Sequence, residues 1–88
     1  MKDSIETPIS WQVVNQSLYK KFIFLNFSEA FAFMTRVALE AEKADHHPTW
    51  TNTWQTVEIW LQTHEAGIRI TEKDIQLAEK IDQLVANK

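Results

Sequence analysis

The feature that most constrains the fold of this 88-residue chain is the repeated change in its hydrophobic period. Apolar residues alternate with polar ones over residues 11–14, 18–25 and 56–63, which is the period of a β-strand. They recur every three or four residues over 28–45 and 71–85, which is the period of an amphipathic helix. The order strand, strand, helix, strand, helix predicts an α+β domain in which an antiparallel sheet of three to four strands carries two main helices on one face.

The first two strands are predicted to form a hairpin, because the turn-forming run Asn15-Gln16-Ser17 separates them. In the second strand, both faces carry apolar side chains: Leu18, Phe22 and Phe24 on one, Tyr19, Ile23 and Leu25 on the other. One layer of helices covers only one of these faces. We therefore expect another copy of the chain to cover the second, in a homodimer or a homotetramer.

The first helix is predicted to begin at Ser28, a good N-cap residue, and to run for about four turns. Its apolar positions are Ala30, Phe31, Met34, Val37, Ala38 and Ala41. It is expected to end near Asp45, because Pro48 disfavours helical geometry in the residue before it. Residues Thr49 to Trp54 are predicted to be a loop.

The third strand, Thr56 to Thr63, alternates most clearly, with Val57, Ile59 and Leu61 on one face. If this alternation continues, His64 points away from the aliphatic face, together with Trp60 and Gln62. The last helix is predicted to begin at Thr71, with Asp74 three residues later in a variant of the capping box. Its buried stripe is predicted to comprise Ile75, Ala78, Ile81 and Val85, with Leu77 and Leu84 beside them.

Composition narrows the class of protein. We divide the chain into a polar N-terminal lead-in, residues 1–10, and a single domain, residues 11–88. The chain has no cysteine, its net charge is −3 and its basic residues are dispersed, so neither a thiolate metal site nor a nucleic-acid surface is expected. No apolar run approaches the length of a membrane span. These features predict a cytoplasmic protein with no membrane partner.

The three histidines of the chain, His46, His47 and His64, are the candidate catalytic groups. Histidine titrates near neutral pH, so one protonated and one neutral imidazole can act as general acid and general base. Two other interpretations remain open from spacing alone: the histidines are ordinary surface residues, or they bind zinc. Adjacent residues seldom direct both rings at one ion and no HExxH motif is present, so no metal site is predicted.

Four further residues are candidates for a supporting role. Glu42 and Asp45 are carboxylates close to His46 at the expected carbonyl end of the first helix, where they and the helix dipole favour the charged imidazole. Trp50, like Trp54 and Trp60, offers a flat wall for a planar ligand or a surface for a subunit contact. Asp74 is explained by its place at a helix start without any catalytic role.

The spacing of these residues resembles a known signature. Glu42 is followed after three residues by His46-His47-Pro48, after five more by Trp54, after nine by His64 and after nine by Asp74. This pattern is similar to that of the pterin-4a-carbinolamine dehydratases, and the likeness extends over residues 11–84. The segment between His64 and Asp74 is one residue longer than in vertebrate relatives, so the resemblance alone does not assign a role to Asp74.

The resemblance implies a function and a substrate site. Members of this family dehydrate 4a-hydroxytetrahydropterin to quinonoid dihydropterin for aromatic amino acid hydroxylases, without a metal or an organic cofactor, because the pterin is the substrate. It implies that the histidines are catalytic and that the substrate-binding residues are His46, His47, Pro48, Thr63, His64, Glu65 and Ala66. It also implies dimers or tetramers. Some vertebrate members bind a homeodomain transcription factor, so the alternative function is a non-enzymatic, oligomeric interaction module with a relic pterin pocket.

Overall fold

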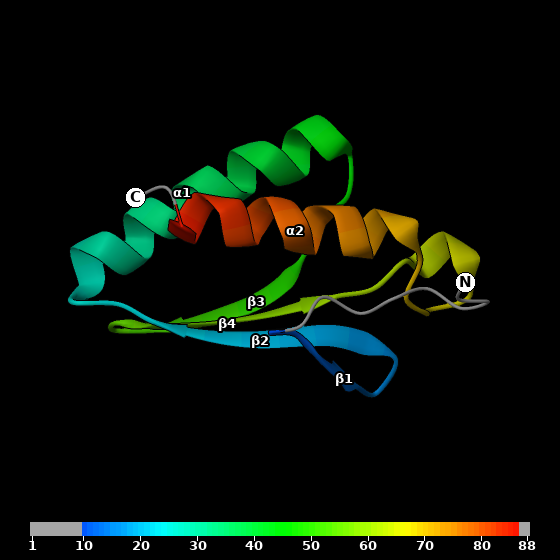
Figure 1. The fold of residues 1–88 in the computed structure, drawn as a ribbon, viewed down its shortest axis with the longest axis horizontal. Coiled ribbons are helices and arrows are strands. Elements are labelled where there is room, and N and C mark those ends of the chain that lie inside the picture. The colour runs from blue at the N-terminus through cyan, green and yellow to red at the C-terminus, as the bar shows by residue number, and fades with distance from the viewer. Residues whose placement is uncertain (1–9, 87–88) are drawn as a thin grey trace.

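The computed structural model of the chain describes residues 10–86, with four strands, two helices and one short 3₁₀ turn. The elements are β1 (Gln12–Val14), β2 (Ser17–Ile23), α1 (Phe27–Ala44), β3 (Thr49–Thr53), β4 (Thr56–Leu61), the 3₁₀ turn η1 (His64–Ala66) and α2 (Glu72–Ala86). The lead-in predicted for residues 1–10 lies outside the described residues, except for Ser10. Both helices lie on the same side of the sheet (Figure 1).

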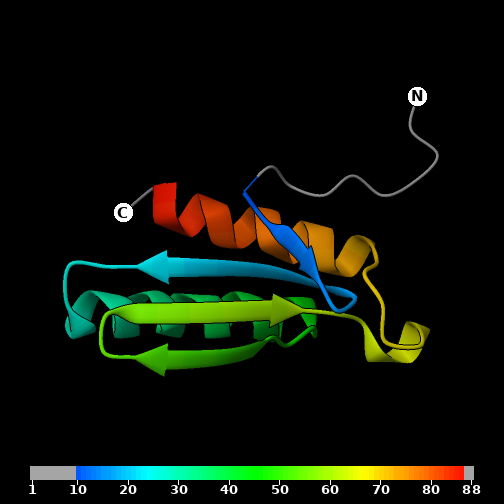
Figure 2. The same cartoon turned by 90° about the horizontal axis from the view of Figure 1, so that it is seen from below.

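The strands form one antiparallel sheet in the order β1-β2-β4-β3 (Figure 2). The prediction of an α+β fold with an antiparallel sheet and two main helices is therefore confirmed. In the central pairing, Leu18 lies opposite Leu61 and Phe22 opposite Val57. Because side chains alternate across a sheet, this register places both pairs on the helix-covered face. All four of these residues are buried.

The predicted hairpin turn is confirmed. Asn15 and Gln16 both have positive φ, 50° and 67°, and Val14 pairs with Ser17 across them. Two successive residues with positive φ are what a tight two-residue hairpin requires, and asparagine tolerates this conformation best after glycine. The second strand is shorter than predicted, because it begins at Ser17 and ends at Ile23.

The predicted loop at Thr49 to Trp54 is wrong, because residues Thr49–Thr53 form the edge strand β3. The strand pairs with β4, with Trp50 opposite Ile59, and the reversal between them is made by Trp54 and Gln55. Threonine and tryptophan both favour strands. The alternation of apolar and polar residues was missing because only one side chain of this strand, Trp50, is large and apolar.

The start of α1 also differs from the prediction. Asn26, and not Ser28, is the N-cap: its side-chain oxygen accepts a hydrogen bond from the amide of Glu29 at 2.9 Å. The end is confirmed, because Asp45 adopts a left-handed conformation with φ 52° and caps the helix after Ala44.

The core lies between the sheet and the two helices. Helix α1 contributes Ala30, Phe33, Val37 and Ala41, and helix α2 contributes Ile75, Leu77, Ala78 and Ile81. The predicted stripe of α2 is thus largely confirmed, with Leu84 and Val85 partly buried at its end. The predicted stripe of α1 is corrected, because Phe31 and Ala38 are exposed and Phe33 is buried in their place.

The second face of the sheet is uncovered in the described part of the chain. Ile23 is 65% exposed there, and Leu25, two residues after the end of β2, is 78% exposed. Tyr19 lies beside Trp60 on the same face, with ring centroids 5.2 Å apart, and its hydroxyl donates to Glu58 at 2.6 Å. This hydrogen bond raises the pKa of the Tyr19 hydroxyl above its ordinary value. Neither described helix has the length and apolarity to cross a bilayer.

Near its C-terminal end, helix α2 makes polar contacts with β2 and with the residue before β1. Asp82 accepts hydrogen bonds from Nε1 of Trp11 at 3.1 Å and from Nζ of Lys20 at 2.9 Å. The ammonium of Lys20 also lies 4.9 Å from the ring centroid of Phe22. Trp11 is only 3% exposed, so its indole N–H depends on this carboxylate for an acceptor.

We expect Asp82→Ala to lower the free energy of unfolding by about 1–2 kcal/mol, because it leaves the buried indole N–H unpaired and removes the partner of Lys20. Urea denaturation measures this change. Glu79→Ala, on an exposed position of the same helix, is the matched control and should stay within about 0.5 kcal/mol of the wild type. Equal effects of the two substitutions would contradict the assigned contact.

Candidate active site

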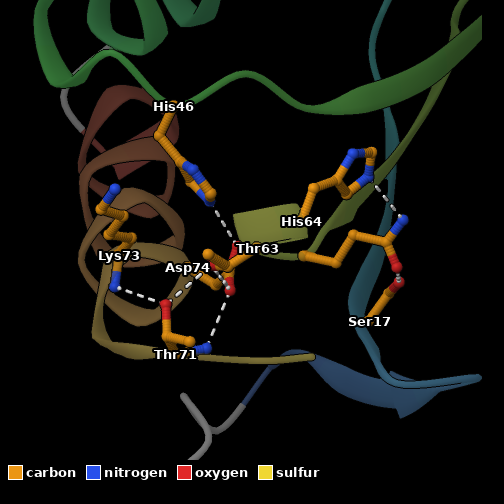
Figure 3. A network of polar contacts seen from close by, with 8 residues as sticks. Ser17, His46, Thr63, His64, Thr71, Lys73 and Asp74 are labelled. Carbon is orange, nitrogen blue, oxygen red and sulfur yellow. Dashed lines mark hydrogen bonds and ion pairs between the residues drawn. The ribbon is translucent and has the colours of Figure 1, made fainter. Parts of the chain in front are cut away.

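The chain positions His46 through the end of helix α1. The left-handed residue Asp45 donates its backbone N–H to the carbonyls of Ala41 and Glu42, and the amide of His46 donates to Ala41 at 3.1 Å. These bonds satisfy carbonyls that the helix end would otherwise leave open. They turn the chain so that His46 points back toward the first turn of α2, as Figure 3 shows.

His46 is held by the buried carboxylate of Asp74. Nε2 of His46 lies 2.5 Å from Oδ1 of Asp74, and the two residues are 7% and 0% exposed. The other carboxylate oxygen accepts the hydroxyl of Thr63 at 2.7 Å and the backbone N–H of Thr71 at 2.9 Å. Thr71 and Asp74 thus form half of the predicted capping box, and the same carboxylate reaches His46.

The hydroxyls of Thr71 and Thr63 form a chain of hydrogen bonds that ends at Asp74. The proton of the Thr63 hydroxyl is used on Asp74, so the Thr71 hydroxyl, 2.7 Å away, donates to Thr63. Both oxygens of Asp74 are therefore supplied with donors. A fully buried carboxylate is stable only when it is paired and hydrogen-bonded, and His46 is the side chain paired with it. Nε2 of His46 faces Asp74, which leaves Nδ1 as the other ring nitrogen.

His64 lines the same cleft as His46 but comes from the chain after β4 rather than from the end of α1. Two residues separate it from the end of β4, and it lies at the start of the 3₁₀ turn with its ring exposed. Nε2 of His64 lies 3.2 Å from the side-chain nitrogen of Gln62. The side-chain oxygen of Gln62 accepts a hydrogen bond from the Ser17 hydroxyl at 2.9 Å. The expected orientation of His64 with Gln62 is confirmed, although His64 belongs to a turn rather than to an extension of the strand.

The three histidines share one open cleft of about 230 Å³. Its lining residues are Asp45, His46, His47, Gln62, His64 and Glu65. Nε2 of His47 lies 2.9 Å from Oε1 of Glu42, in an exposed pair. A hollow of similar size, about 250 Å³, lies between the helices around Phe33 and Leu84, but no histidine lines it. The cleft with the imidazoles is therefore the candidate site.

Glu65 gives the cleft a negative charge at neutral pH. The carboxylate accepts a hydrogen bond from the backbone N–H of Glu65 itself, and this bond, with the charge of Lys73 as the next cause, holds the pKa of the Glu65 carboxyl below its ordinary value. The nearby imidazoles of His46 and His64 act in the same direction. A carboxylate in this position can accept hydrogen bonds from a ligand.

The other predicted site residues lie near the cleft or away from it. Pro48 is half-buried between His47 and β3, and Ala66 ends the 3₁₀ turn after Glu65. Trp50 packs against the core and does not line the cleft. Trp54 is 68% exposed at the β3-β4 turn, the end of that hairpin away from His64. Trp60 is half-buried on the open face of the sheet.

Ser17 and Gln62 belong to the polar network of the site, which Figure 3 draws, although no pattern in the sequence predicted a role for either residue. The one signal in the sequence was the alternation that placed Gln62 on the same face as His64. In the described part of the chain, no group of three histidine or acidic residues is arranged to hold a metal ion.

Comparison with known proteins identifies the family. The sequence profile of the pterin 4 alpha carbinolamine dehydratases matches residues 1–84. The chain belongs to this family. A provisionally named pterin-4-alpha-carbinolamine dehydratase of Mesorhizobium japonicum is 49% identical over 87 residues, which cover 92% of this chain and 88% of that protein. One from Prochlorococcus marinus is 52% identical over 81 residues, 92% of this chain and 84% of that protein.

Two solved structures of similar proteins share the dehydratase fold. The first is a transcriptional coactivator/pterin dehydratase from Brucella melitensis, with a TM-score of 0.82 and 41% identity over 86% of this chain and 82% of that one. The second is a pterin dehydratase-like protein identified as a RuBisCO assembly factor in the α-carboxysome. It has a TM-score of 0.72 and 26% identity over 85% and 88% of the two chains.

Proposed function

We propose that this member of the dehydratase family removes water from 4a-hydroxytetrahydropterin by histidine acid-base catalysis and so recycles pterin for an aromatic amino acid hydroxylase. The observation that carries the proposal is the meeting of three imidazoles from two distant segments in one cleft, one of them paired with a buried carboxylate. The family supplies the substrate class. The proposed catalytic residues are His46, His47 and His64.

The proposed reaction needs only proton transfers. The bond between C4a and the hydroxyl oxygen breaks, and the hydroxyl leaves as water after it has taken a proton. The ring N–H next to C4a loses its proton, and its electron pair forms the new C=N bond. General acid-base groups on both sides of the ring each contribute about 100-fold or more to such a step, so no cofactor is required.

The arrangement around His46 fits the acid. Asp74 occupies Nε2, which leaves Nδ1–H as the proton to be given to the leaving hydroxyl. The proposed pterin-binding residues are Pro48, Thr63, Glu65 and Ala66 together with the histidines. Among them, the Glu65 carboxylate can accept from the amino edge of the pterin. Thr63 contributes indirectly, because its hydroxyl donates a hydrogen bond to Asp74 and not to the pterin.

The proposed enzyme is a homo-oligomer. Exposed apolar side chains lie at the end of β2 and just after it, at Ile23 and Leu25, and on α1, at Phe27, Phe31 and Leu39. Surfaces of this kind are typical of subunit contacts. Sedimentation of the purified chain decides between a monomer and an oligomer.

The proposal is tested by mixing the protein with synthetic carbinolamine in a stopped-flow spectrometer. The expected result is a dehydration rate that rises in proportion to protein concentration. A rate that stays at the uncatalysed value would exclude the enzymatic function.

The second candidate function is a non-enzymatic interaction module. It is favoured by the solved relative described as a RuBisCO assembly factor and by the exposed apolar side chains of this chain. Under this alternative the pterin cleft is a relic.

Ligand binding distinguishes the two functions. If the chain is an enzyme, a dihydropterin analogue at about 100 times its Kd stabilises the folded state by about 2.7 kcal/mol and raises Tm by several degrees. Thermal unfolding with and without the analogue measures this, and a pyrimidine that lacks the second ring is the control ligand. An unchanged Tm at saturating analogue favours the interaction module.

A further inference from the structure

The position of the proton on His64 is set by two residues behind the ring. An amide nitrogen donates hydrogen bonds and does not accept them. The 3.2 Å contact between the side-chain nitrogen of Gln62 and Nε2 of His64 is therefore a hydrogen bond only when Nε2 carries no proton. Ser17 and His64 lie at the two ends of this chain of contacts in Figure 3.

Ser17 fixes which way the Gln62 amide faces. Ser17 is 5% exposed, and its hydroxyl makes no other side-chain hydrogen bond in the part of the chain that the structure describes. If the amide were turned over, the buried hydroxyl proton would lose its only acceptor, and an unpaired buried donor is strongly unfavourable. The amide oxygen is therefore held toward Ser17, and the amide N–H toward His64.

The sheet register places these two residues together. Leu18 lies opposite Leu61 in the pairing of β2 with β4. In an antiparallel pair, the residue before the first and the residue after the second are the next neighbours, and these are Ser17 and Gln62. The contact therefore depends on the central pairing of the fold and not on a flexible loop.

We infer that Ser17 and Gln62 are positioning residues that select one tautomer of the neutral His64 imidazole, with its proton on Nδ1 and a free electron pair on Nε2. This inference rests on the proposed function and deepens it, because it assigns His64 as the base and leaves His46 as the acid. The ring N–H of the pterin replaces the amide N–H of Gln62 at Nε2. Its proton moves to His64 as His46 protonates the departing hydroxyl.

The position of the proton can be observed without turnover. In the full chain with ¹⁵N-labelled histidine, two-bond proton-nitrogen spectra distinguish a protonated from an unprotonated ring nitrogen. The spectra are recorded at a pH about two units above the ordinary histidine pKa of about 6.5, where free rings are neutral. The signals of His64 are those that disappear in His64→Gln. The expected result is an unprotonated Nε2.

Substitutions of Gln62 test the cause. In Gln62→Leu the donor is absent, so we expect the proton of His64 to be shared between both nitrogens. In Gln62→Glu the carboxylate can only accept, so we expect the proton to move to Nε2. At neutral pH, Gln62→Glu should slow dehydration by about tenfold or more, because the base is occupied, and Gln62→Leu by less.

Substitutions of Ser17 test the relay. Ser17→Ala frees the amide of Gln62 to turn over, so we expect a mixture of protonation states at His64. Ser17→Thr keeps the hydroxyl and should restore the wild-type spectrum. A purely structural role for Ser17 would alter stability in the alanine variant without moving the proton on the ring.

Two results would overturn the inference: a wild-type His64 with its proton on Nε2, or a wild-type pattern that persists in Gln62→Leu. Both are independent of catalysis. A chain with the expected spectra and no dehydratase activity would contradict the proposed function and leave the positioning of His64 standing.

Discussion

Replacing His64 by alanine is expected to slow the dehydration of synthetic 4a-hydroxytetrahydropterin by about 100-fold or more. His64 is the only histidine in the cleft that comes from the β4 side of the fold, and its ring is exposed. His46 and His47 come from the end of α1 on the other side and cannot take its place. The rate constant from stopped-flow measurements under single-turnover conditions reports the effect on the chemical step.

The matched control for this experiment is Gln83→Ala, an exposed position on α2 away from the cleft. It should retain the wild-type rate. Because His64 is exposed and makes one long hydrogen bond, its removal should leave Tm almost unchanged. A His64→Ala protein that is folded and dehydrates the substrate at the wild-type rate would show that the base is another group.

Replacing Asp74 by asparagine is expected to lower both stability and activity. The carboxylate is completely buried beside His46, so its neutralisation removes the negative charge next to that imidazole and leaves only an amide oxygen there. The amide NH₂ group also meets donors from Thr63 and Thr71 in place of acceptors. Breaking a buried pair of this kind costs about 3 kcal/mol of unfolding free energy.

The activity of Asp74→Asn should fall by about tenfold or more, because the proposed acid His46 loses the carboxylate that orients its ring. Urea denaturation and the dehydration assay measure the two effects. Glu72→Gln changes an exposed carboxylate in the same helical turn and should alter stability by no more than about 0.5 kcal/mol. The double variant His46→Gln/Asp74→Asn should be less damaged than the sum of the single variants. Additive losses would contradict a direct pair.

The sequence predicted most of the fold because its strongest signals are local. The alternation of Val57, Ile59 and Leu61 predicted the buried face of β4, and Pro48 predicted the end of α1. The edge strand β3 escaped prediction because it is rich in threonine and asparagine and hydrogen-bonds to the sheet on one side only. The N-cap was misplaced by two residues, since both Asn26 and Ser28 are good cap formers.

The site was less predictable than the fold because its contacts are between distant residues. The three histidines were found by residue type, and the structure brings them to one cleft. The bond between His46 and Asp74 spans 28 residues and that between Ser17 and Gln62 spans 45. A local sequence pattern does not predict pairs this far apart. The capping position of Asp74 already explained that residue, so its contact with His46 was not predicted. The register of β2 with β4 is what would have revealed Gln62's partner.

One carboxylate performs two tasks in this structure. Asp74 accepts a hydrogen bond from the backbone N–H of Thr71 at the start of helix α2. It also pairs with His46 and so fixes the position of that ring in the cleft. Transient unwinding of that first helical turn therefore separates His46 from Asp74 while the remaining fold is intact. Amide hydrogen exchange at the start of α2 would then report how often the candidate site is disassembled, and under the proposed function warming would inactivate the protein before it melts.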